Sequence, residues 1–131
     1  MVKRAEASGG LDEFEGIVEK AEFESAFGDR RQYHLTIDAT NVEVGGATGK
    51  LHEWVPMSAT CTEDTVPPQS VMDRYLQQLE ICIKAVEKAE TIAAAFKLVV
   101  GKKFKWKKMK LGRDFEGNKA KDYFVPVALI E

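Results

Sequence analysis

The chain has little cysteine, little histidine and no long apolar run. Two of its 131 residues are cysteine, and Cys61 and Cys82 lack the C-x-x-C spacing of a metal knuckle. Two isolated thiols favour a reducing, cytoplasmic compartment. The longest apolar run, residues 92–96, has five residues, whereas a membrane helix needs roughly 18. The first ten residues also lack the apolar core of a signal peptide, so we expect no membrane association.

Motifs that carry enzyme chemistry are missing too. The sequence has no G-x-x-x-x-G-K-[ST], G-x-G-x-x-G or G-x-S-x-G. The only histidines, His34 and His52, could share a sheet face and hold a metal, but no clear carboxylate partner accompanies them. Glu22 and Glu24 could form a catalytic acid pair, although surface acids on a strand are far more common. We therefore predict a protein that is not an enzyme and has no metal and no cofactor.

Length and patterning indicate one domain. The chain is long enough to bury a single core, so we assign residues 11–131 to one domain and residues 1–10 to a flexible tail that ends in two glycines. Alternating apolar and polar residues predict five strands, at 11–27, 31–40, 50–57, 102–110 and 123–130. In the first, the apolar parity changes near Gly16, which indicates a bulge or coil. In the last, Pro126 favours an edge or a bulge.

Helical spacing appears only between the third and fourth strands. Pro67 and Pro68 mark a boundary, and Ser70 with Asp73 resembles a capping box. Apolar residues then recur at helical spacing as far as Val86. A second helical stretch is predicted from about 91 to 98, with Gly101 as its stop.

The inward face of the third strand stays open at this point. Leu51, Glu53, Val55 and Met57 alternate with His52, Trp54 and Pro56. If the first set points inward, Trp54 is exposed beside His52. If the second set points inward, Trp54 belongs to the core, which is the more common place for tryptophan.

What the sequence does have is a strongly basic segment, residues 97–121. Ten lysines or arginines and two acids give it about +8, and since the whole chain is −2, the other residues carry about −10. Lysines interleaved with Phe104 and Trp106 suit a groove that holds a phosphate backbone and stacks bases. The same alternation is also typical of a half-buried strand with a solvated lysine face, because lysines protect sheet edges.

The order of elements resembles the OB-fold, a five-stranded Greek-key barrel, with a helical insert between strands 3 and 4. Gly16 in the first strand, the polar outer parity of residues 31–40 and the basic residues 102–121 carry this resemblance, which covers residues 11–131. The family that looks closest is the single-stranded-nucleic-acid-binding proteins of replication-protein-A and phage type. The resemblance implies a mostly β fold and binding by the strand 2–3 face and by the loops between strands 1–2 and 4–5.

The resemblance and the basic segment together predict a non-catalytic protein that binds single-stranded DNA, with RNA as a possible ligand. The predicted contacts are Arg30, Arg31, His34, His52, Trp54, Lys103, Lys105, Trp106, Lys107, Lys110, Arg113, Phe115 and Lys119. The helical insert is longer than is typical of an OB-fold, which favours a second role such as subunit contact. The alternative is therefore a homo-oligomeric interaction or structural module on the same barrel.

Overall fold

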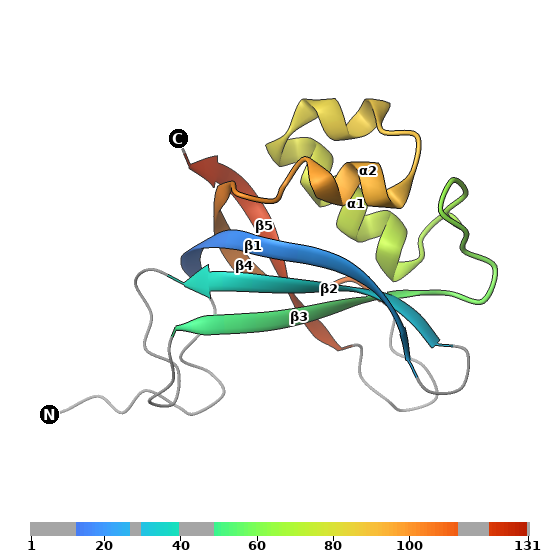
Figure 1. Ribbon diagram of the computed structural model, residues 1–131, viewed down its shortest axis with the longest axis horizontal. Helices are drawn as coiled ribbons and strands as arrows, with labels where there is room; N and C mark the ends of the chain where they lie inside the picture. The colour runs from blue at the N-terminus through green and yellow to red at the C-terminus, as the bar shows by residue number, and fades with distance from the viewer. Residues whose placement is uncertain (1–12, 27–29, 40–48, 113–120, 131) are drawn as a thin grey trace, which may run out of the picture.

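The computed structural model describes residues 13–26, 30–39, 49–112 and 121–130. They form a mostly β structure in which a five-stranded antiparallel sheet is covered on one side by helices (Figure 1). In chain order the elements are β1 (Glu13–Ala26), β2 (Arg30–Ala39), β3 (Lys50–Met57), α1 (Val71–Cys82), the 3₁₀ helix η1 (Lys84–Lys88), α2 (Ile92–Lys97), β4 (Lys103–Lys110) and β5 (Asp122–Ile130). The predicted five strands, with helices between the third and fourth, are confirmed.

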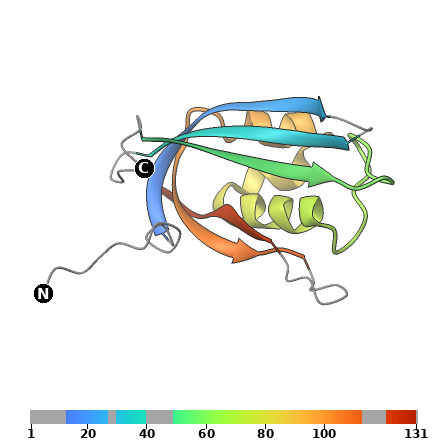
Figure 2. The same ribbon diagram turned by 90° about the horizontal axis from the view of Figure 1, so that it is seen from below.

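The long first strand joins the two halves of the sheet. The strand order is β3-β2-β1-β4-β5, so β1 pairs with β2 along residues 16–26 and with β4 along residues 13–17. Figure 2 shows β1 curving from the β2–β3 side round to the β4–β5 side. This strong curvature is consistent with a barrel-like fold.

A bulge in β1 explains its change of apolar parity. Phe14 and Val18 are buried, and the pairing register with β2 then shifts between Val18 and Lys20. The irregularity predicted at Gly16 therefore lies just beyond it. Gly16 is instead needed for close packing, because a Cβ there would lie 2.6 Å from Ile37 Cγ2 and 3.1 Å from the Asp38 carbonyl oxygen. Glycine at this position allows β1 and β2 to approach closely.

The two faces of β2 and β3 are cleanly separated. The predicted inward set of β2 from Tyr33 to Ala39 is buried, and its polar set lies on the outer face. In β3 the inward set contains Leu51, Glu53 and Val55, so Trp54 lies outside. In β5 the predicted irregularity is confirmed as a register shift opposite Lys105 and Trp106, and β5 is an outer strand of the sheet order.

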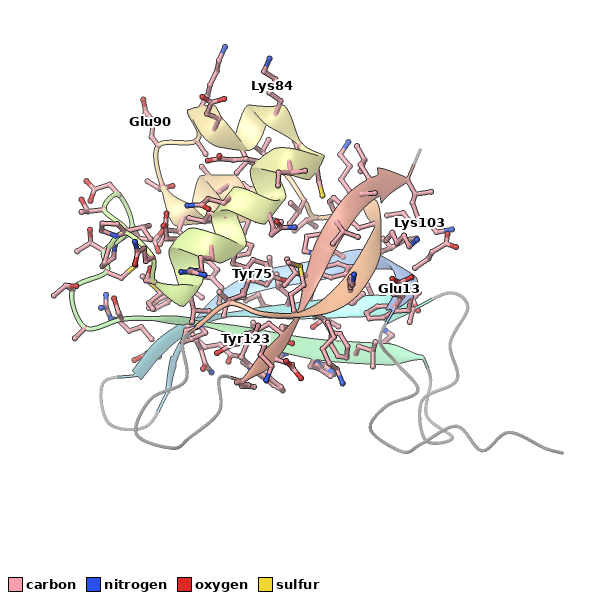
Figure 3. The ribbon with its side chains drawn as sticks, turned by 180° about the vertical axis from the view of Figure 1, so that it is seen from behind. Glu13, Tyr75, Lys84, Glu90, Lys103 and Tyr123 are labelled. Atoms are coloured by element: carbon pink, nitrogen blue, oxygen red, sulfur yellow. The ribbon has the colours of Figure 1, made fainter. Side chains whose placement is uncertain are left out.

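The helical insert packs its apolar stripe onto the sheet. The Ser70 side chain caps α1 by accepting from the Asp73 backbone N–H, and Met72, Tyr75 and Leu79 are buried. The stripe continues to Val86, but α1 ends at Cys82 because Ile83 is extended, and η1 and α2 follow as separate short helices. Figure 3 shows Tyr75 pointing toward the sheet, while Lys84 and Glu90 lie on the far side of the insert.

Candidate nucleic-acid interface

Three aromatic rings lie together on the outer face of β2 and β3. In the pairing register His34 is opposite Trp54, and Thr36 is opposite His52. The His34 and Trp54 rings are stacked with centroids 4.8 Å apart and planes at 15°, and the His52 and Trp54 rings are stacked at 5.9 Å and 22°. We call His34, His52 and Trp54 the ring platform. The sequence predicted all three as contacts, and the structure brings them together.

Glu24 on β1 anchors the ring platform. Its carboxylate accepts from Gln32 Nε2 at 3.1 Å and from His34 Nδ1 at 2.9 Å. Burial raises the pKa of Glu24. Hydrogen bonds from Gln32, His34 and the Trp54 side chain, together with the His34 charge, lower the pKa by more than burial raises it. The pKa therefore falls below its ordinary value. The rings are therefore held in place by a carboxylate rather than resting loosely on the sheet.

Trp54 is the accessible ring of the ring platform. It is 39% exposed, although its neighbours Glu53 and Val55 are buried. The set of β3 that contains Glu53 therefore points inward, and Trp54 faces outward. A large aromatic side chain that is stacked on one side and open to solvent suits stacking with a flat ligand.

Trp106 has the opposite environment. It is 1% exposed, its ring stacks against Phe14 with centroids 6.0 Å apart, and its Nε1–H donates to the Gly16 carbonyl oxygen at 3.0 Å. Phe104 beside it is also buried. Both rings of β4 therefore belong to the core, and Trp106 is not accessible for stacking in this structure.

The predicted lysines of β4 lie beside acids. Lys103 Nζ is 3.7 Å from Glu15 Oε1, and Lys105 Nζ is 3.7 Å from Glu13 Oε2. Figure 3 shows Glu13 and Lys103 at the same end of the sheet. Lys110 Nζ lies 4.0 Å from Asp122 Oδ1, and Lys107 is exposed. Because β1 supplies acids to β4, the positive field of the basic segment is weaker than its sequence alone indicates.

The arginines and the long loop contribute less to this face. Arg31 has the inward parity of β2 and donates to the Ser58 carbonyl oxygen at 3.1 Å. Arg30 is the first residue of β2, and its side chain is outside the described part of the structure. Arg113, Phe115 and Lys119 lie outside the described residues altogether.

Sequence reasoning missed four polar neighbours of the ring platform. The sequence suggests Glu24 only as half of an acid pair and Gln32 only as part of the polar outer face of residues 31–40, and it predicts no role for Lys20 and Lys50. Lys20 pairs in register with Thr36, and Lys50 Nζ lies 3.1 Å from Glu19 Oε2. The hairpin of β1 and β2 was predictable, so pairing its outward residues in register could have found Glu24 beside Gln32.

The other face of the same strands carries an apolar groove. Phe23 is 49% exposed and meets Tyr33 edge-on, with ring centroids 5.8 Å apart. A space of about 310 Å³ beside them is lined by Phe23, Arg31, Tyr33, Met57, Glu63 and Ala93. Glu63 Oε2 accepts from the Tyr33 hydroxyl at 2.6 Å. Burial raises the pKa of Tyr33, and the hydrogen bond and charge of Glu63 raise it further.

Other site types have less support in the described residues. No group of three or more His, Cys, Asp or Glu there is arranged to hold a metal ion. Cys61 is buried and Cys82 half-buried, both are free thiols, and burial raises the pKa of each. Within the same ranges no helix has the length and apolar character required to cross a bilayer.

The chain matches no protein-family model, and no curated protein sequence matches it. Its function is therefore inferred from the ring platform and the strands that carry it.

Proposed function

We propose that this protein binds single-stranded nucleic acid, DNA in the first instance, at the ring platform of an OB-type barrel. The exposed Trp54 ring, stacked on His34 and anchored through Glu24, is the observation that carries the proposal. The position of the rings supports it as well, since OB-folds use the face of strands 2 and 3 for oligonucleotides. RNA offers the same kinds of stacking base and the same phosphates, and is the nearest alternative ligand.

Binding would combine stacking with phosphate contact. A base laid on the open face of Trp54 extends a stack that already contains the imidazole of His34. Lys20 and Lys50 on the same outer face, and Lys107 on β4, are exposed cations for the backbone. Stacking tolerates any base because every base has a π-face, so we expect weak sequence preference. No group in this arrangement has to form or break a covalent bond.

The direct test is a titration of fluorescently labelled oligo-dT with the protein at low salt. We expect saturable binding that weakens as salt is added, because each phosphate contact releases counterions. Absence of binding at low salt, or affinity that is independent of salt, would refute the proposal.

Trp54→Ala should weaken oligo-dT binding by about 1–3 kcal/mol, the usual effect of losing one stacked base. Phe23→Ala is the matched control, since Phe23 is also an exposed aromatic residue but lies on the other face of the sheet, beside Tyr33. The control should bind like the unmodified protein. Equal losses in the two folded variants would place binding elsewhere.

The apolar groove favours a second candidate function, self-association. Phe23 and Val100 are both exposed, and with Ala93 they line an adjoining space of about 380 Å³. Monomeric proteins seldom leave large apolar patches open. Size-exclusion chromatography at low and high salt separates the two candidates. Self-association is favoured if the protein is an oligomer, if Phe23→Ala dissociates that oligomer, and if the protein does not bind oligo-dT.

A further inference from the structure

The ring platform contains a continuous chain of hydrogen bonds that crosses three strands. Glu24 Oε2 on β1 lies 2.9 Å from His34 Nδ1 on β2, and His34 Nε2 lies 2.8 Å from His52 Nδ1 on β3. His52 is exposed. Its second ring nitrogen, Nε2, makes no hydrogen bond to any other residue within the described ranges. The chain thus begins at a carboxylate and ends at an open ring nitrogen.

The carboxylate determines where the protons lie. With its pKa lowered, Glu24 is ionised at neutral pH and can only accept hydrogen bonds. His34 Nδ1 must therefore carry a hydrogen. In a neutral imidazole the other nitrogen is an acceptor, so His34 Nε2 accepts from His52 Nδ1–H. His52 Nε2 is then left with a lone pair facing solvent, and the three groups together carry one negative charge.

One proton taken from solvent reverses the outer end of this chain. Protonated His34 donates from Nδ1 to Glu24 and from Nε2 to His52 Nδ1. His52 stays neutral and now carries its hydrogen on Nε2. The negative charge of the cluster is cancelled, and its exposed nitrogen changes from an acceptor into a donor. Both changes favour an incoming anion such as a phosphodiester oxygen.

Other charged groups on this face, two lysines and three acids, carry one net negative charge. They come from all three strands: Lys20, Glu19 and Glu22 on β1, Asp38 on β2, and Lys50 on β3. Lys50 is paired with Glu19, and Glu22 lies opposite His34 in the register. Among these side-chain types only histidine ordinarily changes its charge between about pH 5 and 8.

We propose that His52 Nε2 is a phosphate-binding position that becomes a donor when the Glu24–His34–His52 chain takes up one proton, so that strand binding is coupled to proton uptake. This inference rests on the proposed function and adds the atom that meets the backbone and the condition that controls it. It makes the ring platform a site whose affinity for single strands increases as the solution becomes more acidic.

The test measures the affinity for labelled oligo-dT between about pH 8 and pH 6, the range in which histidine changes charge. Thymine and phosphodiester groups do not titrate there, so any dependence comes from the protein. We expect affinity to rise as pH falls, with a slope that approaches the limit for one linked proton, about tenfold per pH unit. Calorimetry in buffers of different ionisation enthalpy should show net uptake of up to one proton per bound strand.

Variants assign the proton. His52→Gln should bind more weakly near pH 6 and show a shallower pH dependence and less proton uptake, because the charge of protonated His34 remains while the Nε2–H donor of His52 is lost. Asp38→Asn is the matched control, because it removes one negative charge from the same face outside the hydrogen-bonded chain. It should bind slightly more tightly at every pH and keep the slope and the proton uptake of the unmodified protein.

The outcomes separate this inference from the proposed function. Binding that does not change over this pH range, or a slope that is undiminished in His52→Gln, overturns the inference while single-strand binding itself stands. No oligo-dT binding at any pH overturns both. Proton uptake that decreases in folded His52→Gln but is unchanged in Asp38→Asn supports the inference.

Discussion

At the scale of the residue, two backbone N–H groups on different strands point at the carboxylate of Glu53. Trp54 N–H donates to Oε1 and Phe124 N–H donates to Oε2, both at 3.0 Å. Because Phe124 belongs to β5, this one side chain bridges β3 and β5, the two outer strands of the sheet order. The same Phe124 carbonyl accepts from the Tyr75 hydroxyl at 2.8 Å. A buried Glu at position 53 therefore links the outer strands and turns Trp54 outward.

Glu53 also makes stability depend on pH. Burial raises its pKa above 4.5, although hydrogen bonds from Phe124 and Trp54 and the charge of Lys121 act in the opposite direction. A carboxyl group with a raised folded pKa contributes stability that is fully present below its unfolded pKa and is lost as pH rises through the folded pKa. Glu53→Gln removes this titration. Urea unfolding across pH should show the advantage of the unmodified protein over the variant shrinking from about pH 4.5 upward, and a constant difference would contradict this account.

At the scale of the element, β1 holds the sheet together by pairing with both β2 and β4. Its conformation depends on Gly16, which lies against Ile37 and the Asp38 backbone and whose carbonyl accepts from Trp106 Nε1–H. The bulge that follows turns Glu24 to the outer face, where it meets His34. The packing of Gly16 and the position of the ring platform are thus linked through one strand.

Gly16→Ala should destabilise the fold by about 1–3 kcal/mol, the usual cost of overpacking, because the new methyl group would overlap Ile37 and crowd the Asp38 carbonyl. Gly112→Ala is the control, since its nearest neighbour would be Val71 Cγ2 at 3.8 Å. Urea unfolding of both variants measures the difference, and equal stabilities would show that the close approach of β1 and β2 is not needed.

Patterning predicted the elements well but not which aromatic side chains of the strands are exposed. The alternation in 31–40 and the helical spacing after Ser70 are strong because one side of each element is uniformly apolar. The inward face of strand 50–57 is ambiguous in the sequence because its inward set includes a charged residue, Glu53. The burial of Glu53 is explained by the hydrogen bonds that its carboxylate accepts from the Trp54 and Phe124 N–H groups. Trp106 was predicted as a contact because its lysine neighbours suggested a surface, yet Phe14 and Gly16, distant in sequence, enclose it.

At the scale of the whole molecule, charge is less polarised than the sequence indicates. The acids of β1 lie alongside the lysines of β4, with Glu15 next to Lys103 and Glu13 next to Lys105. Exposed ion pairs of this kind contribute little to stability, but they reduce the positive field that the proposed nucleic-acid ligand would meet. We therefore expect a modest dependence of binding on salt for the unmodified protein.

The double variant Glu13→Gln/Glu15→Gln should bind oligo-dT more tightly, because it removes the acids beside Lys105 and Lys103. If both lysines then reach phosphates, the plot of log affinity against log salt should steepen by up to about 1.4, or roughly 0.7 per phosphate on single strands. Titrations at several salt concentrations measure this slope. An unchanged slope would show that β4 lies away from the bound strand.

The most direct test of the central claim uses the indole N–H signals of the two tryptophans in a ¹⁵N-labelled sample titrated with oligo-dT. Trp54 lies exposed on the ring platform, and Trp106 is buried with its Nε1–H bonded to Gly16. We predict that the Trp54 signal shifts progressively and saturates, while the Trp106 signal stays close to its starting position. A stationary Trp54 signal under conditions where the oligonucleotide is bound would contradict the account.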